Sequence, residues 1–82
     1  MSYTLGISAN DMATLHWLQD RGYDCGLLDA LEPTEADDVY TVAEHDAWSI
    51  AELAGDPDSG FACLNWDSDL GREIRRFLEA IV

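Results

Sequence analysis

The sequence predicts a single α+β domain. Short segments rich in β-branched and aromatic residues alternate with longer segments whose apolar residues recur at helical spacing. The hydrophobic content of 48%, with three Trp, three Tyr and two Phe, is too high for a disordered acidic chain. A length of 82 residues suits one domain with one core. We therefore expect an ordered globule over residues 1–82.

The first part of the chain predicts a strand, a helix and then a segment of ambiguous structure. Residues 3–8 (YTLGIS) are rich in β formers, as is typical of a short strand. A helix should follow, with Ser8 or Asn10 as its N-cap and Gly22 as the glycine that ends it. Residues 23–32 (YDCGLLDALE) fit a strand or a short helix equally well.

The next strand and helix have the clearest patterns. Residues 38–44 (DVYTVAE) are the clearest strand in the chain, and Thr41 and Glu44 stand at the spacing of a capping box. In the helix that follows, apolar residues recur at i, i+3, i+4 and i+7. This inward stripe comprises Ala47, Ile50, Ala51 and Ala54, with Leu53 at its edge.

The last part predicts a turn, a strand and a helix. DPDSG (56–60) has the composition of a turn, and FACLNW (61–66) that of a strand. Over 67–82, apolar residues recur closely enough to helical spacing to predict an amphipathic helix. These residues are Leu70, Ile74, Phe77, Leu78 and Ile81.

Two architectures fit this order. If residues 23–32 form a strand, the order βαββαβ with an extra C-terminal helix gives a ferredoxin-like plan. The other architecture is a small three-stranded sheet with three helices. Neither fold by itself implies a function.

No catalytic or cofactor-binding motif stands out. His16 and His45 are the only histidines, and neither has a His or Cys at i+3 or i+4. A zinc site would need both of them together with Cys25 and Cys63 from distant segments, and a Cys–His nucleophilic pair would need the same coincidence. We expect no enzymatic activity, no metal and no cofactor.

Two acidic segments invite a calcium interpretation that the spacing does not support. Asp56 and Asp58 have the first spacing of an EF-hand loop, but Phe61 stands where that loop needs glycine. In the second segment, Asn65, Asp67 and Asp69 occupy every other position, as the first ligands of an EF-hand loop do. Gly71, however, comes one place later than the glycine of that loop. A turn and an Asp-rich helix start explain both segments.

The net charge of −13 is unevenly distributed. Residues 1–71 carry fifteen acids and one Arg, whereas residues 72–82 carry three Arg and two Glu. Between 22 and 71 there are thirteen Asp or Glu and no basic residue other than His, and the chain contains no Lys. Two carboxylates about 6 Å apart in water repel each other by roughly 0.7 kcal/mol before screening. Such repulsion is costly for a domain this small, so the acidity calls for an explanation.

Local structure explains some of the acids. Acids at helix starts complement the helix dipole. These acids are Asp11, Glu44, Asp46, Asp67 and Asp69. A high-salt cytosol is a second explanation, because molar salt shortens the Debye length to about 3 Å and such proteins tend to lack Lys. The chain would then be a small acidic interaction module whose function is unrelated to its charge.

The third explanation is that the surface imitates a polyanion. By size, acidity and lack of catalytic motifs, the chain resembles the small inhibitors of phages and mobile elements. That group includes anti-restriction and anti-CRISPR proteins, several of which are DNA mimics. The resemblance implies an inhibitor that binds a basic, nucleic-acid-binding protein and blocks access of DNA or RNA to it. It rests on the character of the whole chain and assigns no role to any residue.

The contact residues of such an inhibitor should be acids that local structure does not fully explain, with one aromatic anchor. The predicted acids are Glu32, Glu35, Asp37, Asp38, Glu44, Asp46, Asp56 and Asp58. Trp48 is the predicted anchor because it falls beside the inward stripe of its helix, with core packing as the alternative.

The same charge bears on location and direct binding. An acidic surface should be repelled by nucleic acid and by anionic lipid, so we expect neither to be a direct partner. The sequence has no secretory signal pattern and no apolar run long enough to span a bilayer. The expected location is the cytoplasm, or the host cytoplasm if a phage encodes the chain.

Overall fold

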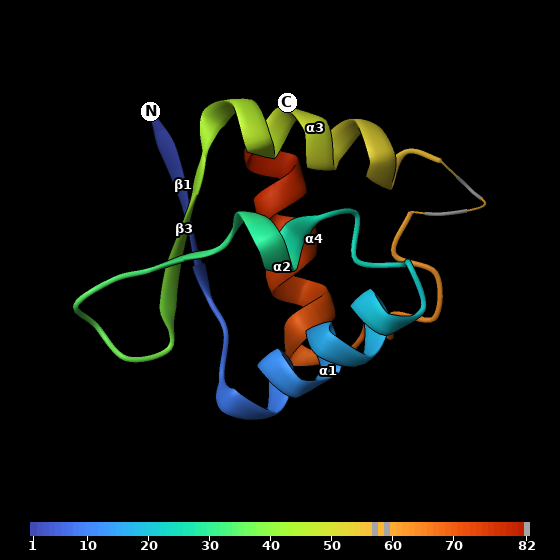
Figure 1. Cartoon of the computed structure of the whole chain (residues 1–82), viewed down its shortest axis with the longest axis horizontal. Coiled ribbons are helices and arrows are strands. Elements are labelled where there is room, and N and C mark those ends of the chain that lie inside the picture. Colours follow the sequence, from blue (N-terminus) through green and yellow to red (C-terminus); the bar gives the residue numbers. More distant parts are fainter. Residues whose placement is uncertain (57, 59, 82) are drawn as a thin grey trace.

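A three-stranded antiparallel sheet at one side of the molecule is flanked by helices (Figure 1). The computed structural model describes residues 1–56, 58 and 60–81. The elements in chain order are β1 (Ser2–Gly6), α1 (Ala9–Asp20), α2 (Leu27–Ala30), β2 (Glu32–Pro33), β3 (Val39–Ala43), α3 (Glu44–Ala54) and α4 (Asp69–Ile81). The predicted α+β class is confirmed, in the form of a three-stranded sheet with helices.

The sheet has the order β1–β3–β2, and its register places one apolar face toward the helices. Tyr3 lies opposite Val42, and Leu5 lies opposite Tyr40. Opposed residues in an antiparallel pair share a face, so these four side chains point the same way. Leu5 and Val42 are buried, and the two tyrosines pack against the core.

Helix α1 begins and ends as its sequence predicts. The Ser8 hydroxyl accepts a hydrogen bond from the Asp11 amide at 3.2 Å, which makes Ser8 the N-cap. At the other end, Gly22 adopts φ +78° and donates to Gln19, while Tyr23 donates to Leu18. This pair of bonds is a Schellman motif, which needs a left-handed residue at the position of Gly22.

The ambiguous segment 23–32 contributes both to a helix and to a strand. Asp24 is buried, and its carboxylate accepts from the amides of Gly26 at 3.2 Å and Leu28 at 3.4 Å. These bonds support the single turn of α2, whose start at Gly26 has φ +77°. The chain then extends at Leu31 into β2, which pairs with β3. The third strand of the sheet is thus β2.

The strand predicted over 61–66 was wrong. Phe61 and Cys63 have φ of +45° and +70°, a left-handed backbone that a strand cannot contain. The segment is apolar because it closes the core: Phe61 and Leu64 are buried, and Phe61 meets the Trp66 ring edge-on with centroids 6.1 Å apart. The predicted turn 56–60 includes Pro57 and Ser59, which lie outside the described residues, as does Val82 of the predicted last helix.

Helix α3 carries the predicted stripe but not the predicted cap. Thr41 lies within β3 opposite Thr4, so it is not an N-cap, and Ala43 occupies that position. The strand continues directly to the helix start, which leaves Thr41 no freedom to cap it. Ala47 and Ile50 are buried, as the stripe predicts.

Helix α4 crosses the molecule behind α2 and packs against β1 and α3 (Figure 1). Its predicted apolar positions face the core, with Leu70, Ile74, Phe77 and Ile81 buried. Ser68 caps its start by accepting from the Gly71 amide at 3.1 Å. A Cβ on Gly71 would lie 2.3 Å from the Asn65 carbonyl oxygen, so only glycine fits. Within the described residues, every helix is too short or too polar to cross a membrane.

Candidate protein-binding face

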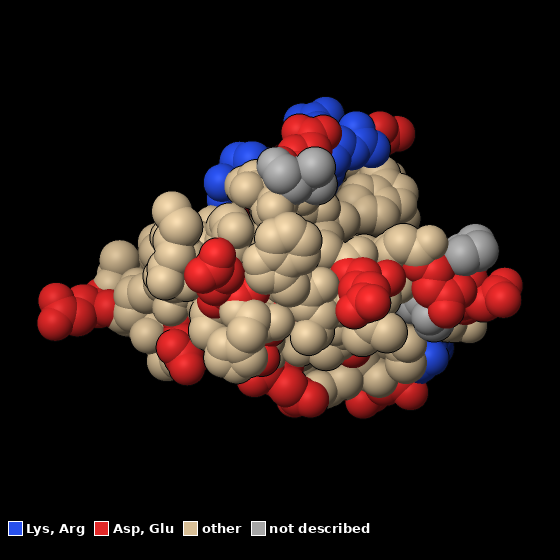
Figure 2. Space-filling model, turned by 90° about the horizontal axis from the view of Figure 1, so that it is seen from above, with Lys and Arg blue, Asp and Glu red and all other residues tan. Residues whose placement is uncertain are grey.

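The predicted contact residues extend along the molecule instead of forming one cluster. The segment 34–38, which joins β2 to β3, projects from the sheet at one end, and α3 leads into Asp56 and Asp58 at the other (Figure 1). The longest dimension is 35 Å. Viewed onto α3, acidic side chains lie at both ends of this axis and between them (Figure 2). We call segment 34–38, the exposed side of α3, and Asp56 and Asp58 the acidic face.

The acids of segment 34–38 are held on an ordered loop. The Thr34 hydroxyl donates to the Val39 carbonyl at 2.9 Å and accepts from the Ala36 amide at 3.2 Å. The Asp38 carbonyl accepts from the Ile7 amide at 2.8 Å, which ties the loop to the end of β1. Glu35, Asp37 and Asp38 are nevertheless exposed to solvent, and none of the ion pairs in the described part of the chain involves them.

The acids at the start of α3 have close polar neighbours within the molecule. The N-terminal ammonium of Met1 lies 4.0 Å from the Glu44 carboxylate, and His45 Nε2 lies 3.4 Å from Asp46 Oδ1. Both carboxylates also lie at the positive end of the helix dipole. Their charge is therefore partly offset within the molecule, unlike that of the three exposed loop acids. Glu32, on β2 at the base of the loop, is exposed.

Trp48 lies on the solvent side of α3, as its position beside the stripe predicts. It is 57% exposed. A surface hollow of about 480 Å³ adjoins it, lined also by Ser49, Ala51 and Glu52. A role for Trp48 in binding stays a prediction.

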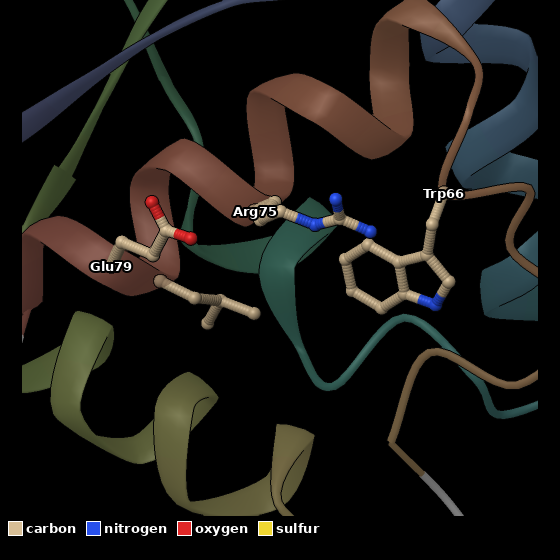
Figure 3. Close-up of a pocket in the computed structure, with 4 residues that line it drawn as sticks. Trp66, Arg75 and Glu79 are labelled. Carbon is tan, nitrogen blue, oxygen red and sulfur yellow. The ribbon is translucent and has the colours of Figure 1, made fainter.

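The other two tryptophans stack with arginines of the same chain. The Arg21 guanidinium lies 3.9 Å from the Trp17 ring centroid, and the Arg75 guanidinium lies 5.7 Å from the Trp66 ring centroid. Figure 3 shows Arg75 extending from α4 toward Trp66, with Glu79 farther along the same helix. These residues and Leu78 line a second open hollow of about 400 Å³.

The arginines of α4 form a separate edge of the molecule. Arg72, Arg75 and Arg76 are all exposed, and Figure 2 shows the basic side chains gathered mainly along one margin. The acidic face and this arginine edge therefore give the molecule a strongly uneven charge distribution.

Sequence reasoning missed a polar clamp at this edge. Glu73 accepts from the Gly6 amide at 2.9 Å and from Arg76 Nε, and Arg76 donates to the Thr4 carbonyl at 2.7 Å. Partial burial opposes ionisation of Glu73, but the bonds from Arg76 and Gly6 and the Arg76 charge outweigh it and lower its pKa. Glu73 thus joins α4 to β1. Sequence patterns did not indicate this role because Glu73 and β1 are far apart along the chain.

The candidate catalytic and metal-ligating residues differ in their exposure. His16 and His45 are exposed, the latter in the first turn of α3, while Cys25 is buried and Cys63 exposed. Burial, together with the charges of Asp24 and Asp56, raises the pKa of Cys25 despite a hydrogen bond with the Phe61 backbone that lowers it. Among the described residues, no three His, Cys, Asp or Glu side chains come together as a metal site.

Comparisons of the chain with protein-family models, with curated proteins and with solved structures gave no match.

Proposed function

We propose that the acidic face binds a basic surface of a nucleic-acid-binding protein or complex and blocks access of DNA or RNA to it. The protein acts by occupying that surface and catalyses no reaction. The observation that carries the proposal is the group of acids on an ordered loop, Glu35, Asp37 and Asp38. The acid that serves the fold, Glu73, has an arginine partner, whereas none of the ion pairs of the described residues includes these three.

Order in the loop favours binding because a mobile acidic segment would lose conformational entropy when it docks. The bonds of Thr34 and Asp38 fix the loop backbone before any partner arrives. The acids are thereby presented at defined positions, as phosphates are on a nucleic acid.

The dimensions of the molecule also suit a polyanion mimic. Its longest axis of 35 Å equals about one helical turn of B-DNA, which is about 34–36 Å. Acids at both ends and over α3 distribute negative charge along this length (Figure 2). A groove that holds one turn of duplex could therefore accept the acidic face. Charge of this kind speeds association and makes binding sensitive to salt.

Competition with nucleic acid tests the proposal. The protein is immobilised, incubated with a bacterial lysate at low salt, and eluted first with duplex DNA and then with RNA. We expect the captured proteins to be basic at the contact surface and to be released by nucleic acid. Retained proteins that nucleic acid does not release, or an absence of captured proteins, would refute the blocking function and favour acidity as an adaptation to a high-salt cytosol.

A further inference from the structure

Trp48 differs from the other tryptophans in what lies next to its ring. Trp17 and Trp66 each have an arginine guanidinium of this chain near the ring face. In the described residues, no such contact occurs at Trp48, although it is the most exposed of the large aromatic side chains. The protein therefore has two filled arginine–tryptophan pairs and one tryptophan that remains open.

The surroundings of Trp48 suit a cation. Glu52 follows Trp48 by four residues on α3, so the two side chains are neighbours on the same side of the helix. Both line the hollow of about 480 Å³, whose remaining lining comes from Ser49 and Ala51. An aromatic face with a carboxylate beside it is the combination from which cation-binding sites are built.

We propose that this hollow is the binding site for an arginine side chain of the partner, a proposal that rests on the function proposed above. The guanidinium stacks on the Trp48 indole and its N–H groups donate to the Glu52 carboxylate. Arginine is favoured over lysine because a planar, weakly hydrated guanidinium stacks on an aromatic ring, whereas an ammonium keeps its water. The negative charge around α3 adds to the attraction for any cation.

The site gives the acidic face a specific anchor. Charge alone attracts many basic proteins and gives little discrimination among them. A buried aromatic–arginine contact at the centre of an interface slows dissociation and selects partners that present an arginine at that position. Trp48 lies on α3, between the two acidic ends of the molecule (Figure 1).

Two peptides probe the site in the intact protein. One is a short, end-blocked peptide of alternating glycine and arginine, and the other has lysine in place of arginine. Binding is followed by NMR through the indole N–H signals, with that of Trp48 identified by its loss in Trp48→Leu. We expect the arginine peptide to shift the Trp48 signal most and to bind more tightly than the lysine peptide. Trp48→Leu should weaken arginine-peptide binding by about five- to tenfold.

Matched variants separate the site from general charge attraction. Trp17→Leu, at a tryptophan that already stacks on Arg21, should leave the affinity unchanged. Glu52→Gln should weaken binding by about two- to fivefold and reduce the preference for arginine.

The possible results distinguish failure of the site from failure of the proposed function. If both peptides bind with the same affinity and Trp48→Leu binds like Trp17→Leu, the arginine site is refuted. Salt-sensitive binding of both peptides would in that case still support the acidic face. If neither peptide binds even at low salt, the arginine site and the proposed function both fail.

Discussion

The acids of the loop between β2 and β3 and the acid at the junction of α4 with β1 are chemically alike but have opposite surroundings. Glu73 is only 22% exposed and bonds to Arg76 and to the Gly6 amide. Glu35, Asp37 and Asp38 are exposed on a loop whose order comes from Thr34 and from backbone bonds, not from their carboxylates. The carboxylate of Glu73 joins α4 to β1, whereas none of the ion pairs of the described residues includes a loop carboxylate. Charge count alone cannot separate these two kinds of acid.

The junction around α4 should be the least tolerant part of the fold. In Gly71→Ala the new methyl group would meet the Asn65 carbonyl and the Trp66 backbone at 2.3 and 2.5 Å. We expect the free energy of unfolding to fall by about 2–3 kcal/mol, measured by denaturant titration. Gly55→Ala is the control, since its Cβ would lie 3.5 Å from the nearest atom, and should change stability by less than about 0.5 kcal/mol. Equal effects of the two changes would contradict the described packing.

The Glu73 clamp should contribute less than this packing but more than any acid of the loop. Glu73→Gln removes the charge that holds Arg76, and should lower the free energy of unfolding by about 1–2 kcal/mol at pH 7. Glu79→Gln on the same helix is the control, and it should have little effect because Glu79 is exposed.

The pH dependence of this difference provides a further check. The folded-state pKa of Glu73 is lowered, so its contribution is present above the unfolded pKa of about 4.3 and is lost as pH falls through the folded value. The stability difference between wild type and Glu73→Gln should therefore shrink at acid pH. A difference that stays constant down to about pH 2–3, below the usual carboxylate pKa values, would show that the Glu73 charge is not responsible.

Repulsion among the loop acids and their acidic neighbours should make the stability of the fold depend on salt concentration. Screening of their mutual repulsion should stabilise the fold by about 1 kcal/mol between low salt and about 0.5 M sodium chloride. For a domain of this size, that corresponds to a rise in Tm of roughly 4–8 °C. A flat or falling Tm would show that the structure already neutralises the acids. A protein that folds only near molar salt would favour adaptation to a high-salt cytosol.

Most of the fold follows from local sequence patterns, and the exceptions have long-range causes. Strand β3 is recognisable because it is rich in β formers, α4 because it has a clear helical period, and α1 because its start and end carry their own signals. Segment 61–66 resembles a strand because a core-filling loop and a strand are both apolar. Phe61 and Cys63 have a left-handed backbone, which phenylalanine and cysteine rarely adopt. The composition of the segment therefore does not indicate that it is not a strand.

The candidate site was predictable to a similar degree. The acid run and the outward position of Trp48 are visible in the sequence. The bonds of Thr34 that order the loop, and the pairing of Trp17 and Trp66 with arginines, depend on the fold. The Glu73 clamp joins residues 67 positions apart, and nothing local indicates it. Glu73 is consequently unsuitable as a control in charge-reversal experiments, although its place beside three arginines suggests otherwise.

The proposed function depends most on the loop acids, and the structure defines a matched pair of variants to test them. The loop variant combines Glu35→Lys and Asp37→Lys with Asp38→Asn, because Asp38 has φ +60° and asparagine tolerates that backbone. The control variant combines Asp20→Lys and Asp67→Lys with Asp29→Asn. The amide side chain introduced by Asp29→Asn would keep an acceptor for Gln19, and all three control sites are exposed. The two variants change the net charge equally.

The decisive measurement is the amount of lysate protein that each immobilised variant captures and that duplex DNA then releases. Both variants should remain folded, since each removes repulsion without removing buried surface. The control should gain less stability, because Asp67→Lys places a cation near the positive end of the α4 dipole. We predict that the loop variant loses at least about nine-tenths of the captured protein, equivalent to a tenfold or greater loss of affinity, while the control retains most of it. Equal losses by the two variants, or none by either, would contradict the claim that the ordered loop acids form the binding face.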